Sequence, residues 1–167
     1  NTIKLISGSF GGINLEDISA PRCFEIETRL KEELDIPVFH DDQHGTAIVM
    51  TAALINALKL SGKKKDAIKV VINGACAAGI AIAKFLMLYG VKDVTLCDLK
   101  GIVCEGEEWL NPAQKEIAKV TNKPRLKGKL ADAMRGADVF IGVSGTNCVT
   151  KDMVKSMADK PILFPCA

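Results

Sequence analysis

Two acidic pairs near the start of the sequence have side chains of the kind that hold divalent metal ions. Glu16-Asp17 follows a glycine-containing segment, and Asp41-Asp42 lies within the polar run H-D-D-Q-H-G at residues 40–45. Mg²⁺ and Mn²⁺ prefer oxygen ligands, and a few carboxylates with water and substrate oxygens complete their octahedron. The same acids would also stabilise helix N-termini, where negative charge is favourable. Their spacing leaves metal binding and helix capping both open.

A glycine-containing turn, Gly74-Ala75-Cys76-Ala77-Ala78-Gly79, is the second candidate site. In the dinucleotide-binding pattern G-x-G-x-x-G, the first glycine makes a tight turn and the second lets the backbone approach the pyrophosphate. The third glycine lets helix and strand pack closely. The N-terminus of the following helix would offer free N–H groups to the phosphates. Cys76 replaces the second glycine, so we expect weakened binding or a slightly shifted cofactor.

Asp98 supports a dinucleotide site in this part of the chain. It ends the next apolar run 19 residues after Gly79, where an acid should meet the adenosine ribose hydroxyls. A carboxylate repels a 2′-phosphate and favours NAD, whereas Lys100 lies two residues further on and could serve that phosphate. The cofactor is therefore expected to be NAD or NADP, with a mild preference for NAD. The alternative is a glycine-containing turn that holds no ligand.

The histidines and cysteines are interpreted as structural groups. His40 and His44 flank the second acidic pair, and loop histidines more often form hydrogen bonds than bind metal. No two cysteines form C-x-x-C, and several lie in apolar runs, which predicts buried free thiols in a reducing compartment such as the cytoplasm. The six cysteines are Cys23, Cys76, Cys97, Cys104, Cys148 and Cys166.

The elements that position these residues follow from the apolar periodicity. A helix is expected from Ser19, as its cap, to Leu34, then a short strand at 38–39 and a polar loop at 40–45. Thr46 is expected to cap a helix at 47–60, which is apolar on nearly every side and therefore predicted to be buried. Further strands are predicted at 68–73, 94–98, 138–143 and 161–166, and further helices at 77–89, 112–120, 130–135 and 152–158.

Alternating strands and helices predict an α/β fold, a Rossmann-type parallel sheet with helices on both faces. We expect residues 1–45 to end a substrate- and metal-binding domain and residues 46–167 to form the dinucleotide-binding domain. The sequence starts without Met and ends in an apolar run, so we expect a segment of a longer chain, with its second domain truncated.

Composition excludes several classes of function. The formal net charge of +2 is too small to indicate a nucleic-acid partner, and the run 63–65, Lys-Lys-Lys, is interpreted as a solvated loop. No apolar stretch is long enough to span a membrane, and the first residues lack the pattern of a signal peptide. Neither a nucleic-acid partner nor a membrane is therefore expected.

Several segments resemble the compact, bacterial-type malic enzymes. Residues 10–17 and 37–47 resemble the two metal-site segments of that family, and residues 72–81 resemble its cofactor turn. Residues 136–144 resemble its later strand beside the nicotinamide. The similarity runs through nearly all 167 residues, and the segment H-D-D-Q-H-G-T is highly specific.

This resemblance implies that malate is oxidatively decarboxylated to pyruvate and CO₂ while NAD(P)⁺ is reduced, in a homo-oligomer, expected to be a dimer. By position, Glu16, Asp17 and Asp42 would hold Mg²⁺ or Mn²⁺. Asp41 would partner the catalytic lysine from outside the metal's ligand set. The residues expected at the cofactor are Gly74, Ala75, Cys76, Ala77, Ala78, Gly79, Asp98, Val143 and Ser144.

The sequence also departs from the family pattern. The catalytic Tyr and Lys motifs and a substrate-binding Asn-Pro motif have no match, so no catalytic acid or base is assigned and the chain alone is expected to be inactive. Residues 144–147 and Pro165 differ from the usual residues. Two alternatives stay open. One is a non-catalytic nucleotide-binding remnant. The other is a different NAD(P)-dependent dehydrogenase, such as an amino-acid dehydrogenase, which would not need the acidic pairs because it needs no metal.

Overall fold

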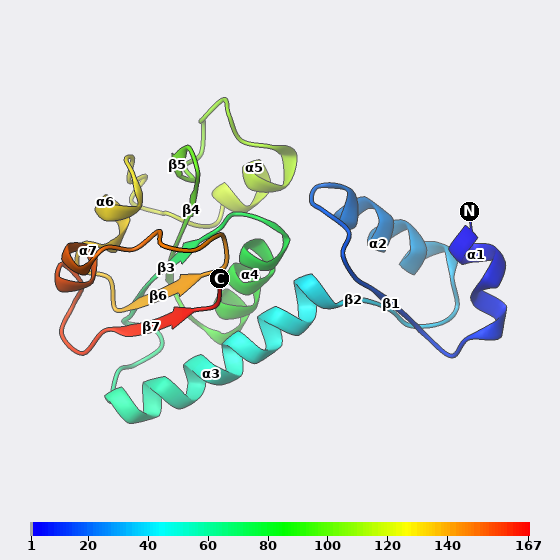
Figure 1. Cartoon of the computed structure of the whole chain (residues 1–167), viewed down its shortest axis with the longest axis horizontal. Helices are drawn as coiled ribbons and strands as arrows, with labels where there is room; N and C mark the ends of the chain where they lie inside the picture. The colour runs from blue at the N-terminus through cyan, green and yellow to red at the C-terminus, as the bar shows by residue number, and fades with distance from the viewer. Residues whose placement is uncertain (1) are drawn as a thin grey trace.

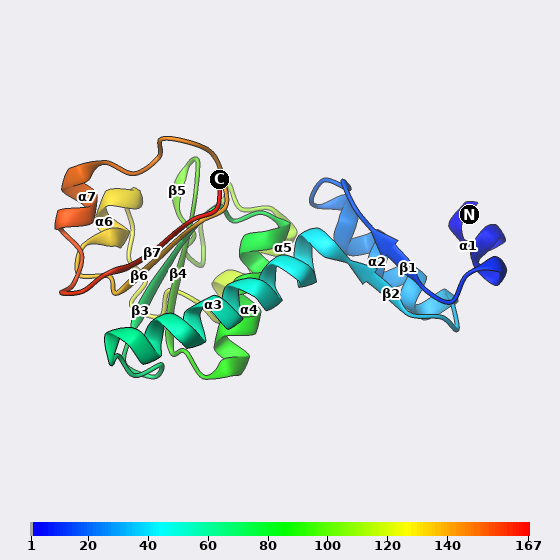
Figure 2. The ribbon, with the colours of Figure 1, turned by 60° about the horizontal axis from the view of Figure 1, so that its bottom comes forward.

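The computed structural model describes residues 2–167, which form a large and a small sheet joined by one long helix (Figure 1). The large sheet has the order β5-β4-β3-β6-β7 and the small sheet the order β1-β2. Helix α3 (Thr46–Ser61) runs from the small sheet to the large one, and Figure 2 shows the same separation from a second direction. The strands are β1 (Ile13–Leu15), β2 (Val38–His40), β3 (Lys69–Asn73), β4 (Asp93–Asp98), β5 (Gly101–Ile102), β6 (Val139–Gly142) and β7 (Ile162–Pro165). The other helices are α1 (Thr2–Ile6), α2 (Arg22–Glu33), α4 (Ala77–Tyr89), α5 (Pro112–Ala118), α6 (Leu130–Met134) and α7 (Lys151–Lys155).

The central strands of the large sheet, β3, β4 and β6, are buried on both faces, whereas the edge strand β7 is partly exposed. Strands β4, β3, β6 and β7 are parallel, and the short β5 adds to the edge in the antiparallel direction. Along β3, Val70 and Ile72 pack into the core beneath α3 and α4, while Val71 packs with Met134 of α6 on the opposite face. Such continuously apolar strands are typical of parallel sheets covered by helices. The predicted α/β class is confirmed. The domain boundary between residues 45 and 46 stays a prediction.

The small sheet is a parallel pair that α2 connects. Leu15 of β1, Leu30 of α2 and Val38 of β2 form its core. Strand β1 and helix α1 were not predicted, although Ile-Asn-Leu at residues 13–15 has the alternation of a half-buried strand.

Three local predictions between residues 19 and 46 are wrong. The residue before α2 is Pro21, and Ser19 supplies a backbone carbonyl rather than a side-chain cap. Residues 41–45 form a π-helical turn instead of a loop, and this turn continues directly into α3. Thr46 therefore lies inside helical backbone and does not cap α3. We call Asp41–Gly45 the acidic turn.

Helix α3 is buried along one face only, which corrects the prediction of a fully buried helix. Met50 and Leu54 pack in the core, whereas Val49 is 60% and Leu60 90% exposed. The reason is that α3 crosses between the two sheets, so that α4 covers only one of its sides (Figures 1 and 2). In the part of the chain that the structure describes, no helix is long and apolar enough to cross a membrane.

The cysteines divide into two groups, so the prediction of buried thiols holds for only half of them. All six are free in residues 2–167, with Cys23, Cys97 and Cys104 buried and Cys76, Cys148 and Cys166 exposed. The exposed thiols lie outside the strands and helices, where little packs over them. Burial raises the pKa of the Cys97 thiol to about 12, so this group stays protonated and acts as a small apolar side chain.

Lys63 is not a solvated loop residue, because it pairs with Asp138, the residue immediately before β6. Its Nζ lies 2.5 Å from Asp138 Oδ1, and the Lys69 backbone N–H donates to Asp138 Oδ2 at 2.9 Å. Both paired side chains are more than four fifths buried. Burial opposes ionisation of Asp138. The Lys63 ammonium group and the Lys69 backbone N–H outweigh this effect, and together they lower the pKa of the Asp138 carboxyl.

This pair predicts a pH-dependent stability. Because the pKa of Asp138 is lowered on folding, its contribution is complete above the unfolded value of about 3.9 and is lost as pH falls through the folded value. We expect Asp138→Asn to lower the free energy of unfolding by about 2 kcal/mol at neutral pH. Denaturant unfolding at a series of pH values should show this difference shrinking on acidification. A difference that is constant with pH would contradict the assignment.

Candidate functional site

The register of the small sheet brings the two acidic pairs to one edge. Strands β1 and β2 are parallel with Leu15 opposite His40, so the residues that follow each strand leave the sheet side by side. The Asp17 backbone N–H donates to Asp42 Oδ2 at 3.2 Å. Asp17 has a φ of 55°, a left-handed conformation that aspartate tolerates better than most residues. The structure therefore joins one member of each pair.

The other two acids are not drawn into this contact. Glu16 and Asp41 are exposed, and Asp41 bends back over Gly45 of its own turn, where an added Cβ would overlap the carboxylate. Within residues 2–167, no three His, Cys, Asp or Glu side chains gather as a complete metal site. The carboxylate donors fit Mg²⁺ or Mn²⁺ in chemistry, but such an ion would also need oxygens from substrate and water. The ligand set Glu16, Asp17 and Asp42 stays a prediction.

A buried polar network lies behind the acidic turn. His44 Nε2 lies 2.6 Å from Glu27 Oε1, and Gln43 Nε2 lies 3.2 Å from Glu27 Oε2 and 2.9 Å from His40 Nδ1. Lys31 pairs with Glu27 at 2.7 Å. Burial opposes the charge of Glu27, but hydrogen bonds from Lys31 and His44 lower the pKa of this carboxyl. The two histidines thus form hydrogen bonds, as the sequence predicted.

Glu27 is a site residue that the sequence did not reveal. It lies in α2, four residues after Cys23 and three before Leu30, both of which are buried. An acid on the apolar face of a helix needs a polar partner inside the fold, and this position was the available signal.

The turn after β3 packs against the segment that follows β6. Gly74 has a φ of 124°, and a Cβ there would lie only 3.0 Å from the Val143 carbonyl carbon and oxygen. Asn73 Nδ2 donates to Ser144 Oγ at 2.8 Å, across the same gap. The structure thus brings Gly74, Val143 and Ser144 together at the carboxyl ends of two parallel strands, where ligands of open α/β sheets bind.

The other glycine of the turn allows helix α4 to approach. A Cβ on Gly79 would overlap the Gly74 carbonyl oxygen, so any side chain there must displace the turn. Ala75 and Ala77 are buried and Ala78 is partly buried around the same bend. These contacts match the packing role of the third glycine in the dinucleotide pattern.

Cys76 stands immediately before α4 with an exposed side chain. Its φ of −95° is open to any residue, so the backbone does not require glycine here. Its Sγ lies 3.8 Å from the Val143 carbonyl oxygen, the acceptor toward which it turns. Cys76 would therefore disfavour a bound cofactor only because its side chain occupies space near the phosphates. Weakened binding stays a prediction.

Asp98 at the end of β4 is held by two donors. The Leu99 backbone N–H donates to its Oδ1 at 2.7 Å, and Gln114 Nε2 donates to its Oδ2. Gln114 Nε2 also donates to the Ala75 carbonyl at 3.1 Å, and the side chain is 4% exposed. Gln114 was not predicted as a site residue. It ties the carboxylate that should meet the ribose to the turn that should meet the phosphates.

We predict that Gln114→Leu weakens NAD⁺ binding about tenfold, equivalent to about 1.4 kcal/mol, because Asp98 and the turn lose their common donor. Calorimetric titration of the complete protein would measure the NAD⁺ dissociation constant. Lys115→Met, an exposed change on the same helix, serves as control. Equal NAD⁺ affinities for the Gln114 variant and the wild type would contradict the linking role.

Comparisons with known proteins agree on one family. A family described as "Malic enzyme, NAD binding domain" matches residues 43–167. The chain is 59% identical over 167 residues to the bifunctional malic/malolactic enzyme of Bacillus subtilis, covering 99% of this chain and 41% of that protein. It is 48% identical over 168 residues to the NADP-dependent malic enzyme of Haemophilus influenzae, covering 99% and 22%.

A solved structure gives the same result. The NAD-dependent malic enzyme of Thermotoga maritima matches 97% of this chain and 44% of its own, with a TM-score of 0.94 and 54% identity. The chain spans less than half the length of each of these three relatives.

Proposed function

Because this chain belongs to the malic enzyme NAD-binding domain family, we propose that the complete protein oxidatively decarboxylates malate to pyruvate and CO₂ while reducing NAD⁺ or NADP⁺. The observation that carries the proposal is the parallel register of β1 and β2, which sets the Asp17 N–H against Asp42. The acidic turn that carries Asp42 packs on α4, the helix behind the cofactor turn. The acidic residues and the cofactor turn therefore belong to one packed unit.

The chain's own residues would bind and orient. Asp42 and Asp17, with Glu16 beside them, would hold Mg²⁺ or Mn²⁺, and Asp41 would orient a neighbouring base. The backbone from Gly74 to Ala78 and the start of α4 would hold the pyrophosphate. When bound, the cation would polarise the malate hydroxyl and stabilise developing negative charge, and the nicotinamide would accept the hydride. None of these residues is assigned proton transfer.

Cofactor choice and assembly belong to the same proposal. Asp98, fixed by Gln114 and Leu99, supports NAD⁺ as the better cofactor because a carboxylate disfavours a 2′-phosphate.

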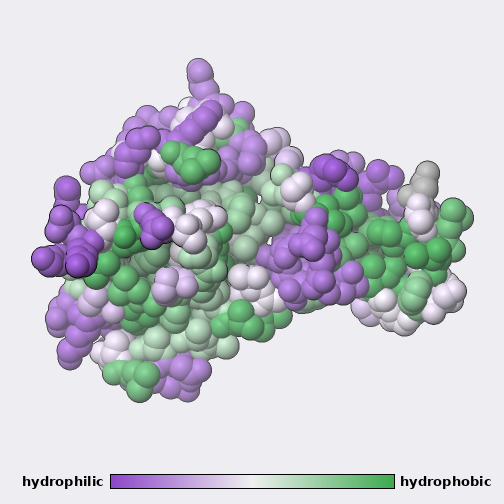
Figure 3. Space-filling model, in the orientation of Figure 1, coloured by the Kyte–Doolittle hydropathy of each residue, from purple (hydrophilic) through white to green (hydrophobic). Residues whose placement is uncertain are grey.

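A homo-oligomer, expected to be a dimer, is supported by apolar side chains exposed around α1, which colour this end of the surface green in Figure 3. Leu5 is 85% and Phe10 53% exposed. We place the protein in the cytoplasm.

The test is malate-dependent reduction of NAD⁺ or NADP⁺ by the complete protein, followed by nicotinamide absorbance. We expect turnover with Mg²⁺ or Mn²⁺, none with excess EDTA, and recovery when Mn²⁺ is restored. Metal-independent turnover would overturn the proposal. Cofactor binding without turnover would favour a nucleotide-binding protein, and amino-acid-dependent reduction a different dehydrogenase.

A further inference from the structure

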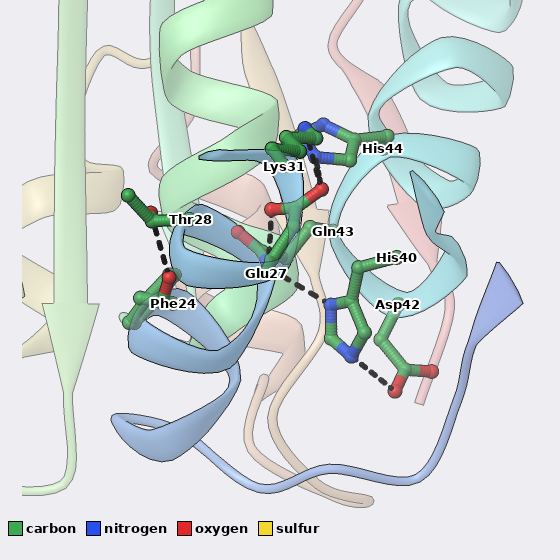
Figure 4. Close-up of polar contacts among 8 residues, drawn as sticks. All are labelled: Phe24, Glu27, Thr28, Lys31, His40, Asp42, Gln43 and His44. Atoms are coloured by element: carbon green, nitrogen blue, oxygen red, sulfur yellow. Dashed lines mark hydrogen bonds and ion pairs between the residues drawn. The ribbon is translucent and has the colours of Figure 1, made fainter. Parts of the chain in front are cut away.

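His40 is a buried histidine with one unused ring nitrogen. Its side chain is fully buried at the end of β2, and Nε2 is a buried polar atom without a hydrogen-bond partner among the described residues. The nearest charged atom is Asp42 Oδ2, at 3.5 Å, slightly beyond a good hydrogen bond. Figure 4 shows the ring turned edge-on toward this carboxylate.

The network on the other side of the ring fixes where its proton is. A carboxylate only accepts, so Glu27 obliges Gln43 to present its amide nitrogen, and that nitrogen also faces His40 Nδ1 at 2.9 Å. Nδ1 must then accept and carries no proton. The ring proton of His40 therefore sits on Nε2 and points at Asp42. The lowered pKa of Glu27 agrees with an ionised carboxylate that accepts the hydrogen bond from Gln43.

Asp42 is approached by donors on one oxygen only. Among residues 2–167, its polar contacts both use Oδ2, one from the Asp17 N–H at 3.2 Å and one from the His40 ring. With the Asp17 N–H bonded to Oδ2 and the His40 ring facing the same oxygen, Oδ1 is the free acceptor of the carboxylate. A buried N–H without a partner is costly, so the ring has a physical reason to hold Asp42.

We propose that His40 is a positioning residue that donates from Nε2 to Asp42 Oδ2 and so turns Oδ1 toward a divalent cation, its own tautomer being set by Gln43 and Glu27. This inference rests on the proposed function, because Asp42 is assigned there as a metal ligand. Hydrogen bonds from such outer residues orient metal-binding carboxylates, and their loss typically weakens metal affinity by about 10- to 100-fold.

The first test measures Mn²⁺ affinity of the complete protein without substrate, by the loss of the free Mn²⁺ electron paramagnetic resonance signal. We expect His40→Leu to raise the Mn²⁺ dissociation constant about tenfold. His40→Gln, which retains a donor and an acceptor, should restore most of the affinity. Thr28→Val is the matched control, because the Thr28 hydroxyl bonds only to its own helix, at the Phe24 carbonyl.

The second test keeps His40 in place. Gln43→Met removes the donor to Nδ1, and ¹⁵N NMR of the imidazole should show the proton on Nε2 in the wild type and a mixture in this variant. The same variant should bind Mn²⁺ more weakly. A wild-type proton on Nδ1, or unchanged Mn²⁺ affinity in folded His40→Leu, would overturn the role of His40 alone. Wild-type protein that binds no Mn²⁺ would overturn the proposed metal site with it.

Discussion

Asp42→Ala is expected to abolish metal-dependent malate oxidation, lowering kcat/KM about a thousandfold or more. A catalytic metal supplies several kcal/mol of transition-state stabilisation, and about 4 kcal/mol corresponds to a thousandfold in rate. Asp42 is the acid that the structure joins to the other acidic pair, through the Asp17 N–H. Removing the Asp42 carboxylate should therefore weaken Mn²⁺ binding more than removing the exposed Glu16 carboxylate does. Initial rates at several malate and Mn²⁺ concentrations, with NAD⁺ saturating, measure the effect.

The matched control is Asp35→Ala. Asp35 is an exposed aspartate between α2 and β2, outside the acidic turn, and its removal changes the charge of the protein by the same amount. We expect its rate and Mn²⁺ dependence to match the wild type. An Asp42→Ala protein that keeps wild-type Mn²⁺ affinity and turns over within tenfold of the wild type would show that the cation sits elsewhere.

The part of the site that sequence predicted is the part with local causes. The run Lys69–Asn73, the glycines at 74 and 79 and the helix behind them are each specified by residues within a few positions, so strand, turn and helix were placed correctly. The apolar run ending at Asp98 placed β4 for the same reason.

The remaining features depend on contacts between distant residues. Gln43 meets Glu27 across 16 positions, and Gln114 meets Ala75 across 39, so neither periodicity nor a local motif could pair them. The acidic turn was expected to be a loop because its residues are polar. Burial of Gln43 and His40 against α2 instead gives those polar groups internal partners, and the backbone continues as helix. Pro165 is accommodated for a similar long-range reason, since β7 lies at the edge of the sheet.

Gly79→Ala is expected to disrupt the cofactor half of the site more than any other single methyl group. The new Cβ would overlap the Gly74 carbonyl oxygen, which is backbone and cannot rotate away. Either the turn or the start of α4 must shift. Forcing a methyl group into such packing costs about 3 kcal/mol. The same shift misaligns the backbone N–H groups at the start of α4, so NAD⁺ affinity should fall at least about tenfold, or 1.4 kcal/mol.

Two measurements separate these consequences in the complete protein. Thermal unfolding measures the loss of stability caused by the added methyl group. Calorimetric titration with NAD⁺ measures the loss of affinity caused by the displaced turn. Gly8→Ala is the control, because nothing lies within 4 Å of its added Cβ. A Gly79→Ala protein with wild-type stability and NAD⁺ affinity would mean that the turn tolerates a wider separation of strand and helix. The close approach of α4 would then not be what shapes the cofactor site.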